Sequence, residues 1–143
     1  MVKKIFALLI CFIGLTIFIS ILNCQGLVNT ITLPNGEVVQ DLNGEWDVLV
    51  EFYGPWISFN SYKGICKITQ KGSSFTGVRI IDDKYNPKGT QNFRGELDKS
   101  GIKNVQYISN RWDPIDAKGI ISEGGNIVII NDGEKIKVTL TRK

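Results

Sequence analysis

Hydrophobic and polar positions follow two different patterns along this chain. An unbroken apolar run extends from Ile5 to Leu22, directly after Lys3 and Lys4. From Gly44 onward, apolar residues instead alternate with polar ones at the period of two that half-buried β-strands require. Clusters of Gly, Asn, Asp and Pro interrupt this alternation at short, regular intervals. The pattern predicts an export or anchor segment at the N-terminus, followed by an all-β domain.

Eight short strands are predicted after Gly44. The clearest alternation places Phe93 and Leu97 on one face of a strand, with Arg94 and Glu96 on the other. No ten-residue window beyond the first apolar run has helical spacing. The predicted strands are Glu45–Tyr53, Gly64–Gln70, Phe75–Ile81, Gln91–Asp98, Ile102–Ser109, Asp116–Glu123, Asn126–Ile130 and Glu134–Thr141.

Eight consecutive antiparallel strands have a natural closed arrangement. An up-and-down barrel pairs both edges of the sheet, and eight strands enclose room for side chains or for one small ligand. The predicted fold class is therefore an all-β, eight-stranded antiparallel up-and-down barrel. A Greek-key β-sandwich is the alternative, because short alternating strands also suit two packed sheets.

The apolar run ends at Ile21-Leu22-Asn23-Cys24, which decides how the N-terminus is interpreted. This tetrapeptide resembles the lipobox of bacterial lipoproteins, in which an aliphatic residue stands three positions before a cysteine. The resemblance implies that diacylglycerol is attached to Cys24 and that the leader is cut off before it. Asn23 departs from the usual Gly, Ala or Ser. An uncleaved membrane anchor is the alternative, because roughly 18 apolar residues approach the length of a spanning helix.

Three parts of the chain follow from this interpretation. Residues 1–23 are expected to be a lipoprotein signal peptide or an N-terminal anchor. Residues 24–43 are expected to be the lipidated cysteine and a polar tether, with a turn at Leu33-Pro34-Asn35-Gly36 and a short strand at Ile31–Leu33 or Val38–Val39. Residues 44–143 are expected to form the barrel. The protein is then expected at a bacterial cell envelope, held on the outer side of a membrane by lipid on Cys24 or by the apolar segment.

Gly44-Glu45-Trp46 stands at the start of the first predicted barrel strand, and Arg142 follows the last one. With these residues the barrel segment resembles the calycins, which include lipocalins, fatty-acid-binding proteins and avidins. That family has a G-x-W at the start of its first strand and a basic residue after its last strand that covers the tryptophan. The hairpin from Ile68 to Gly77 resembles the avidin-like short barrels in particular. The resemblance implies a lipocalin-like meander closed at one end by Trp46 and Arg142.

Composition excludes several function classes. The formal net charge is only +3, two of these charges lie in the leader, and no basic run follows, so nucleic acid is not an expected partner. The chain has no histidine, which removes triad-type nucleophilic catalysis and the commonest metal ligand. No phosphate-binding or dinucleotide motif is present. We expect a protein that is not an enzyme, with no cofactor and no metal.

The cysteines leave one alternative open. If Cys24 carries lipid, Cys66 is left as a free, buried thiol, because Cys11 lies within the leader. If Cys24 is not lipidated, it could form a disulfide with Cys66 in an oxidising compartment.

Loop lengths point to one end of the barrel as the candidate site. In an up-and-down barrel, alternate connections lie at the same end. The turns after the second, fourth and sixth strands are short, whereas those after the first, third and fifth, at 54–63, 82–90 and 110–115, are longer. The longer loops are expected to form an open mouth facing away from the membrane. Its candidate ligand-binding residues are Tyr53, Trp56, Phe59, Tyr62, Tyr85, Arg111 and Trp112.

Three interpretations of these aromatic residues remain, and one of them is contact with lipid. They could hold a small apolar or amphipathic ligand or a partner protein of the envelope or host, because aromatic loops over a concave scaffold are common recognition devices. They could instead fold inward and complete a solid barrel of a non-catalytic structural or interaction lipoprotein. Arg79 shares a face with Phe75 and Gly77, so it could point inward toward an anionic ligand, but a solvated, outward arginine is favoured.

Overall fold

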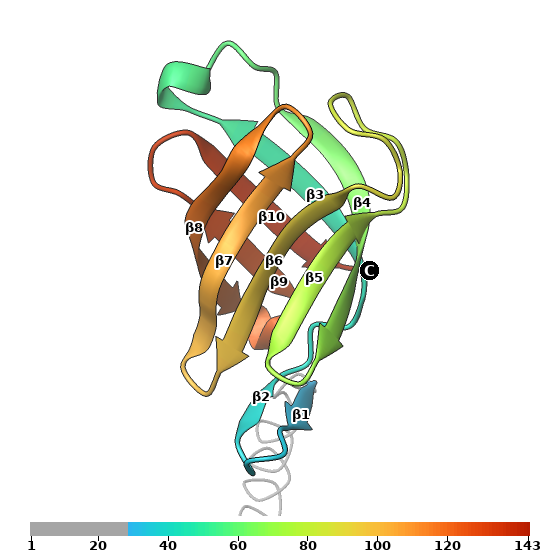
Figure 1. Cartoon of the computed structure of the whole chain (residues 1–143), viewed down its shortest axis with the longest axis vertical. Coiled ribbons are helices and arrows are strands. Elements are labelled where there is room, and N and C mark those ends of the chain that lie inside the picture. The colour runs from blue at the N-terminus through green and yellow to red at the C-terminus, as the bar shows by residue number, and fades with distance from the viewer. Residues whose placement is uncertain (1–28) are drawn as a thin grey trace, which may run out of the picture.

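Residues 29–143 form a closed antiparallel barrel above a small hairpin in the computed structural model, which describes this part of the chain (Figure 1). The barrel strands are hydrogen-bonded in the order β10-β3-β4-β5-β6-β7-β8-β9, and β9 pairs with β10 to close the ring. The prediction of an eight-stranded up-and-down barrel is confirmed. The Greek-key sandwich is not formed. Cys24 and the predicted signal or anchor segment lie outside the described residues.

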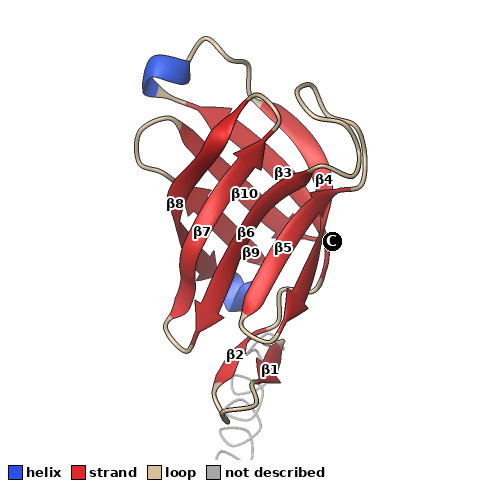
Figure 2. Ribbon diagram, viewed as in Figure 1, coloured by secondary structure: helices blue, strands red, loops and turns tan. Residues whose placement is uncertain are grey.

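All eight predicted strands are present, and a two-stranded sheet precedes them. Two 3-10 turns, η1 (Gly54–Trp56) and η2 (Glu123–Gly125), lie in the connections (Figure 2). The described part of the chain contains no helix long and apolar enough to span a bilayer. The strands are β1 (Thr30–Thr32), β2 (Val38–Gln40), β3 (Gly44–Phe52), β4 (Tyr62–Lys71), β5 (Ser74–Arg79), β6 (Gln91–Asp98), β7 (Gly101–Ser109), β8 (Trp112–Ser122), β9 (Ile127–Asn131) and β10 (Ile136–Arg142).

Regular alternation directs one side of strands such as β3 and β10 into the barrel. In β10, Ile136, Val138 and Leu140 are fully buried, while the residues between them are partly exposed. The same alternation buries every second residue of β3 from Trp46 to Phe52. Burial of these side chains supplies the main driving force for closing the barrel.

Two pairs of a glycine and a phenylalanine fill the middle of the bore. A Cβ atom on Gly77 would overlap the ring of Phe93, and one on Gly95 would lie 2.7 Å from Cζ of Phe75. Each ring therefore packs directly on the bare backbone of a neighbouring strand. Both phenylalanines are buried, and their ring centroids are 6.3 Å apart. The middle of the barrel is thus packed with side chains.

The segment predicted as a tether carries an ordered hairpin beneath the barrel. Its strands β1 and β2 pair with each other, and Leu33, Val39 and Leu42 are buried. Gln70 of β4 holds the segment in place, since its side chain accepts the N–H of Leu42 at 2.7 Å and donates to the carbonyl of Gln40 at 3.2 Å. This end of the barrel, which we call the base, is therefore covered by residues 30–43.

Trp46 and Arg142 meet at the base. The Arg142 guanidinium carbon lies 4.5 Å from the centroid of the buried indole, within cation–π distance. Arg142 also donates to the carbonyl oxygens of Asn43 at 2.8 Å and Asp41 at 2.5 Å, and Trp46 Nε1 donates to that of Leu42 at 3.0 Å. The first and last barrel strands and the hairpin segment are thereby joined at one point.

The opposite end, the mouth, carries the longer loops. The β3–β4 and β5–β6 connections project from it in Figure 1, at residues 53–61 and 80–90, as expected. The expectation of a third long loop at 110–115 is wrong. Strand β8 begins at Trp112, which pairs directly with Ser109, so only Asn110 and Arg111 connect β7 to β8.

Candidate functional site

Aromatic side chains gather at the mouth and cover the end of the bore. They come from the end of β3, the β3–β4 loop, the start of β4, the β5–β6 loop, and the facing ends of β7 and β8. We call this group the mouth cluster. It consists of Phe52, Trp56, Phe59, Tyr62, Tyr85, Tyr107 and Trp112.

Phe52 occupies the centre of the cluster. Its ring centroid lies between 5.6 and 6.3 Å from those of five neighbours, in tilted or edge-on contacts. The indoles of Trp56 and Trp112 approach most closely, at 4.6 Å. Such pairs contribute about 0.5–1.5 kcal/mol each beyond the area they bury. The aromatic loops therefore fold over the barrel rather than standing open.

Five of the seven predicted mouth residues belong to this cluster. Tyr53 does not, since it is 41% exposed and makes a backbone bond to Lys135. Arg111 is exposed and lies outside the bore, with its guanidinium carbon 5.3 Å from the Tyr85 centroid. Ile57, which was not singled out, is 75% exposed at the tip of the β3–β4 loop. The rim thus combines exposed apolar and cationic side chains around a covered centre.

Arg79 points into the barrel below the mouth cluster and is only 2% exposed. The favoured interpretation of a solvated, outward arginine is wrong. Gly77 and Phe75 precede it on the inner face of β5, so period-two alternation places Arg79 inside. Its Nε pairs with the Asp83 carboxylate, and Nη2 donates to the Tyr62 hydroxyl at 3.2 Å. An ion pair buried this deeply is costly unless each partner is satisfied, as these are.

The hydroxyl groups of Tyr62 and Tyr107 meet across the bore at 2.9 Å. Burial raises the pKa of both phenols above the ordinary value. Burial also raises the pKa of the Cys66 thiol to about 12. These three groups stay protonated at neutral pH, so the interior below the mouth cluster offers two hydroxyl groups, a thiol and the Arg79–Asp83 ion pair.

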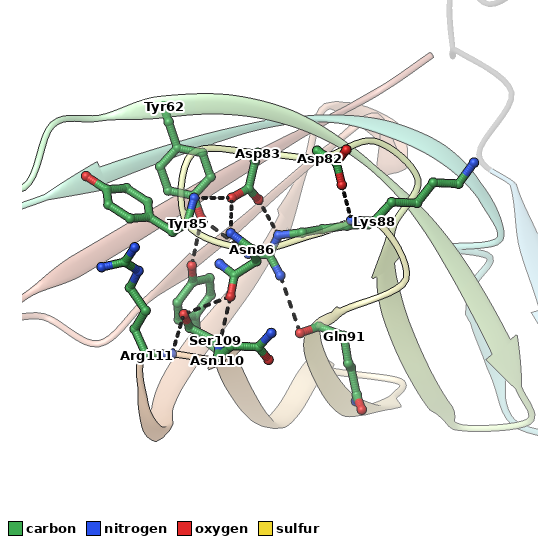
Figure 3. Close-up of polar contacts among 12 residues, drawn as sticks. Tyr62, Asp82, Asp83, Tyr85, Asn86, Lys88, Gln91, Ser109, Asn110 and Arg111 are labelled. Carbon is green, nitrogen blue, oxygen red and sulfur yellow. Dashed lines mark hydrogen bonds and ion pairs between the residues drawn. The ribbon is translucent and has the colours of Figure 1, made fainter.

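Asp83 and Asn86 hold the β5–β6 loop against the mouth (Figure 3). One Asp83 oxygen accepts the backbone N–H groups of Tyr85 and Asn86, both at 2.8 Å, while the other accepts from Arg79. The Asn86 side-chain oxygen accepts the Ser109 hydroxyl at 3.1 Å and the Asn110 N–H at 2.8 Å. This network was not predicted. An Asp within a loop commonly bonds the backbone two residues further on in an Asx-turn, and Asp83 could have indicated part of the network on that ground.

Both carboxylates of the β5–β6 loop already have partners. Asp82 accepts the N–H of Lys88 at 2.8 Å, and Asp83 pairs with Arg79. Within residues 29–143, no group of three or more Cys, Asp or Glu side chains is placed to hold a metal ion. The bonds of Asp82 and Asp83 hold the β5–β6 loop against the barrel.

Comparison of the chain with protein-family models, with curated proteins and with solved structures finds no match. The geometry of the site is that of a closed barrel with a packed bore and an aromatic mouth above a buried arginine.

Proposed function

We propose that this protein is a non-catalytic binding protein tethered to the outer side of a bacterial membrane. Its aromatic mouth takes up a small apolar or amphipathic molecule. Lipid on Cys24, or the apolar segment Ile5–Leu22, holds it to the membrane. We further propose that the barrel is lipocalin-like, as Gly44-Glu45-Trp46 and the covering Arg142 suggest.

The observation that carries the proposal is the mouth cluster above the buried Arg79. A barrel needs apolar filling at its ends, but it does not need a guanidinium, two phenols and a carboxylate beneath that filling. Concave sites that bind small molecules combine an apolar lining with a few convergent polar groups. Because Phe75 and Phe93 fill the bore, binding is confined to the mouth and requires the aromatic loops to move.

A second candidate function is a solid barrel that docks a protein partner. Ile57 favours it, because a 75% exposed isoleucine at a loop tip is an apolar contact point on the rim. Lys84 and Arg111 over Tyr85, together with Lys135 over Trp56, would surround this contact with positive charge. In this case the mouth cluster would act only as packing.

Heavy-atom quenching of tryptophan fluorescence separates the two functions. The full chain, in phosphatidylcholine nanodiscs, is titrated with 1-bromodecane, whose bromine quenches an indole on contact. Uptake at the mouth predicts saturable quenching of Trp56 and Trp112, whereas a solid barrel predicts only the linear quenching that arises from partition into the bilayer.

The variant Trp56→Phe/Trp112→Phe provides the control. It leaves Trp46 as the only indole, fully buried at the base. Saturable quenching is expected to disappear in this variant. If it persists, the probe binds elsewhere and the mouth is not the site.

The anchoring proposal has its own test. Intact mass of the membrane-extracted protein distinguishes a chain that begins at a lipid-bearing Cys24 from one that keeps Met1. The variant Cys24→Ser is expected to lose the added hydrocarbon mass. An unmodified mass that includes Met1 in the parent chain would favour the uncleaved anchor.

A further inference from the structure

Two buried hydrogen-bond donors in the mouth have no partner among the described residues. They are Nδ2 of Asn86 and Nε1 of Trp112. Asn86 is only 2% exposed. A buried donor without an acceptor costs about 1–3 kcal/mol, and native proteins contain few of them. Two in one structural corner therefore require a reason.

The orientation of Asn86 is fixed by its neighbours. Its side-chain oxygen accepts the backbone N–H of Asn110 at 2.8 Å, a group that can only donate. The amide nitrogen must therefore point away from the β7–β8 turn. An amide rotated by half a turn would place two donors against each other, so the free donor is not an ambiguity of assignment.

Ser109 links the two donors. Its hydroxyl bonds to the side-chain oxygen of Asn86, and its backbone pairs directly with Trp112 across the β7–β8 ladder. Directly paired residues on neighbouring strands share one face of the sheet. The Asn86 amide and the Trp112 indole therefore belong to the same inward-facing corner of the mouth, beside the rings of Tyr107 and Trp56.

The acceptors around this corner are already used. Asp83 takes three donors, and the Asn86 oxygen takes two. The Ser109 hydroxyl accepts the N–H of Arg111 at 3.3 Å. Three cations, those of Lys84, Arg111 and Lys135, lie over aromatic rings at the rim. The corner thus has donors in excess.

We propose that the mouth selects ligands that carry a hydrogen-bond acceptor without a donor, such as an ester or ketone carbonyl attached to a flat apolar body. The carbonyl oxygen accepts from Trp112 Nε1 and Asn86 Nδ2 while the apolar body replaces ring contacts in the mouth cluster. Hydrocarbons leave both donors unpaired, and ammonium groups add a third donor. This inference rests on the proposed binding function and specifies its ligand chemistry.

Matched naphthalene probes test the selection. The full chain in nanodiscs is titrated with methyl 2-naphthoate, which has only acceptors, and with 2-ethylnaphthalene, which has neither donor nor acceptor. The ester is expected to shift the Trp112 indole N–H resonance downfield in ¹H–¹⁵N spectra. It is expected to bind about tenfold more tightly than the hydrocarbon, the ratio that one recovered buried hydrogen bond supplies.

Two substitutions of the same kind separate hydrogen bonding from packing. Trp112→Phe keeps an aromatic ring but removes the donor, and it is expected to reduce the ester-to-hydrocarbon ratio about tenfold. Trp56→Phe removes a similar ring area next to it, and it is expected to weaken both probes equally. Because each ratio uses the same two probes, their partition into the bilayer cancels between variants.

A third variant, at Asn86, is expected to reverse the preference for acceptor-bearing over donor-bearing probes. Asn86→Asp keeps an oxygen for Ser109 and Asn110 but replaces the free donor with an acceptor. It is expected to reduce binding of the ester and to favour 2-naphthylmethylammonium. If the parent chain binds ester and hydrocarbon equally, or if Trp112→Phe leaves the ratio unchanged, the acceptor site is wrong while the binding function stands. If no probe binds, both proposals fail.

Discussion

Individual residues decide how much space the barrel contains. Gly77 and Gly95 lie opposite Phe93 and Phe75, and each glycine lets a phenyl ring rest on the backbone of the neighbouring strand. Without these glycines the rings would have to leave the bore. The four residues together explain why an eight-stranded barrel, which is wide enough for a small ligand, is filled at its middle.

Gly77→Ala is expected to destabilise the protein by about 1–3 kcal/mol, because the new methyl group overlaps the Phe93 ring in a packed core. Urea unfolding followed by circular dichroism measures the change. Thr76→Ala, on the exposed face of the same strand, serves as the control and is expected to change stability by less than about 0.5 kcal/mol. The double variant Gly77→Ala/Phe93→Leu should recover part of the loss. An unaffected single variant would show that the ring has room to move.

Buried phenols and the buried thiol make the fold sensitive to high pH. Burial raises the pKa of Tyr62, Tyr107 and Cys66 in the folded state, the last to about 12 from 9.0. Below about pH 8 both states hold these protons, so the three groups do not make stability depend on pH. Above pH 9–10 the unfolded state releases them first, and the free energy of unfolding falls as pH rises.

Tyr107→Phe is therefore expected to flatten the decline in stability between pH 9 and 11.5 by up to about 1.4 kcal/mol per pH unit, the contribution of one proton. The free energy of unfolding in urea, measured at several pH values, gives the slope. Tyr53→Phe removes a solvent-exposed phenol and is the matched control. Equal slopes in the two variants would mean that the Tyr107 phenol ionises without unfolding.

At the same scale, the sequence predicted types of residue better than their orientations. Trp56, Phe59, Tyr62, Tyr85 and Trp112 were all assigned to the mouth, and all of them gather there. The inward direction of Arg79 was not predicted. An arginine is usually solvated, and only the partners Asp83 and Tyr62, supplied by a loop and by another strand, make its burial tolerable.

At the scale of elements, alternation and turn residues were sufficient to place the strands. The exception is the start of β8, where Asp113-Pro114 reads as a loop because proline lacks the N–H that a central strand donates. Pro114 is accommodated because the β7–β8 register shifts between Tyr107 and Ser109. Pro114 is compatible with such an irregularity, but the register shift itself depends on the partner strand β7 and cannot be predicted from β8 alone.

The hairpin at the base was also only partly foreseen. One short strand was expected, at Ile31–Leu33 or Val38–Val39, whereas both strands form and pair. Nothing in a polar, turn-rich segment indicated that it covers the barrel. Gln70 and Arg142 hold it there through backbone carbonyl groups, which any sequence possesses. Hydrogen bonds to backbone carbonyl groups cannot be predicted from the pattern of residue types.

Arg142→Lys is expected to destabilise the base by about 1–2 kcal/mol, because an ammonium group cannot reach two carbonyl oxygens in a fork while stacking on an indole. Thermal unfolding followed by circular dichroism measures the loss, and Lys143→Arg at the neighbouring exposed residue is the control. The backbone amides of Leu42 and of residue 142 are also expected to exchange their hydrogens faster in this variant. If the lysine variant is as stable as the parent chain, the positive charge alone accounts for the contribution of Arg142.

At the scale of the whole molecule, the two ends have different environments. The chain enters the barrel through the base, and the long loops lie at the other end (Figure 1). If residues before 29 are attached to a membrane, the base faces the bilayer and the mouth faces away from it.

Labelling with a water-soluble, amine-reactive reagent tests this orientation. Lys84 and Lys88 on the β5–β6 loop are expected to react several times faster than Lys71 and Lys99 at the base when the full chain is tethered to vesicles. All four are exposed, so the difference should vanish once detergent removes the bilayer. Peptide mass spectrometry reads out each site. Equal rates on vesicles would contradict the orientation.

The phenyl-filled bore has a practical consequence for anyone who wishes to use the molecule. Since Phe75 and Phe93 pack the bore between the two ends, a dye, a bead or a sensor chip can be coupled at the base without disturbing the loops at the opposite end. The barrel then serves as a scaffold, and the loops at its mouth can be diversified in a library while the base stays unchanged.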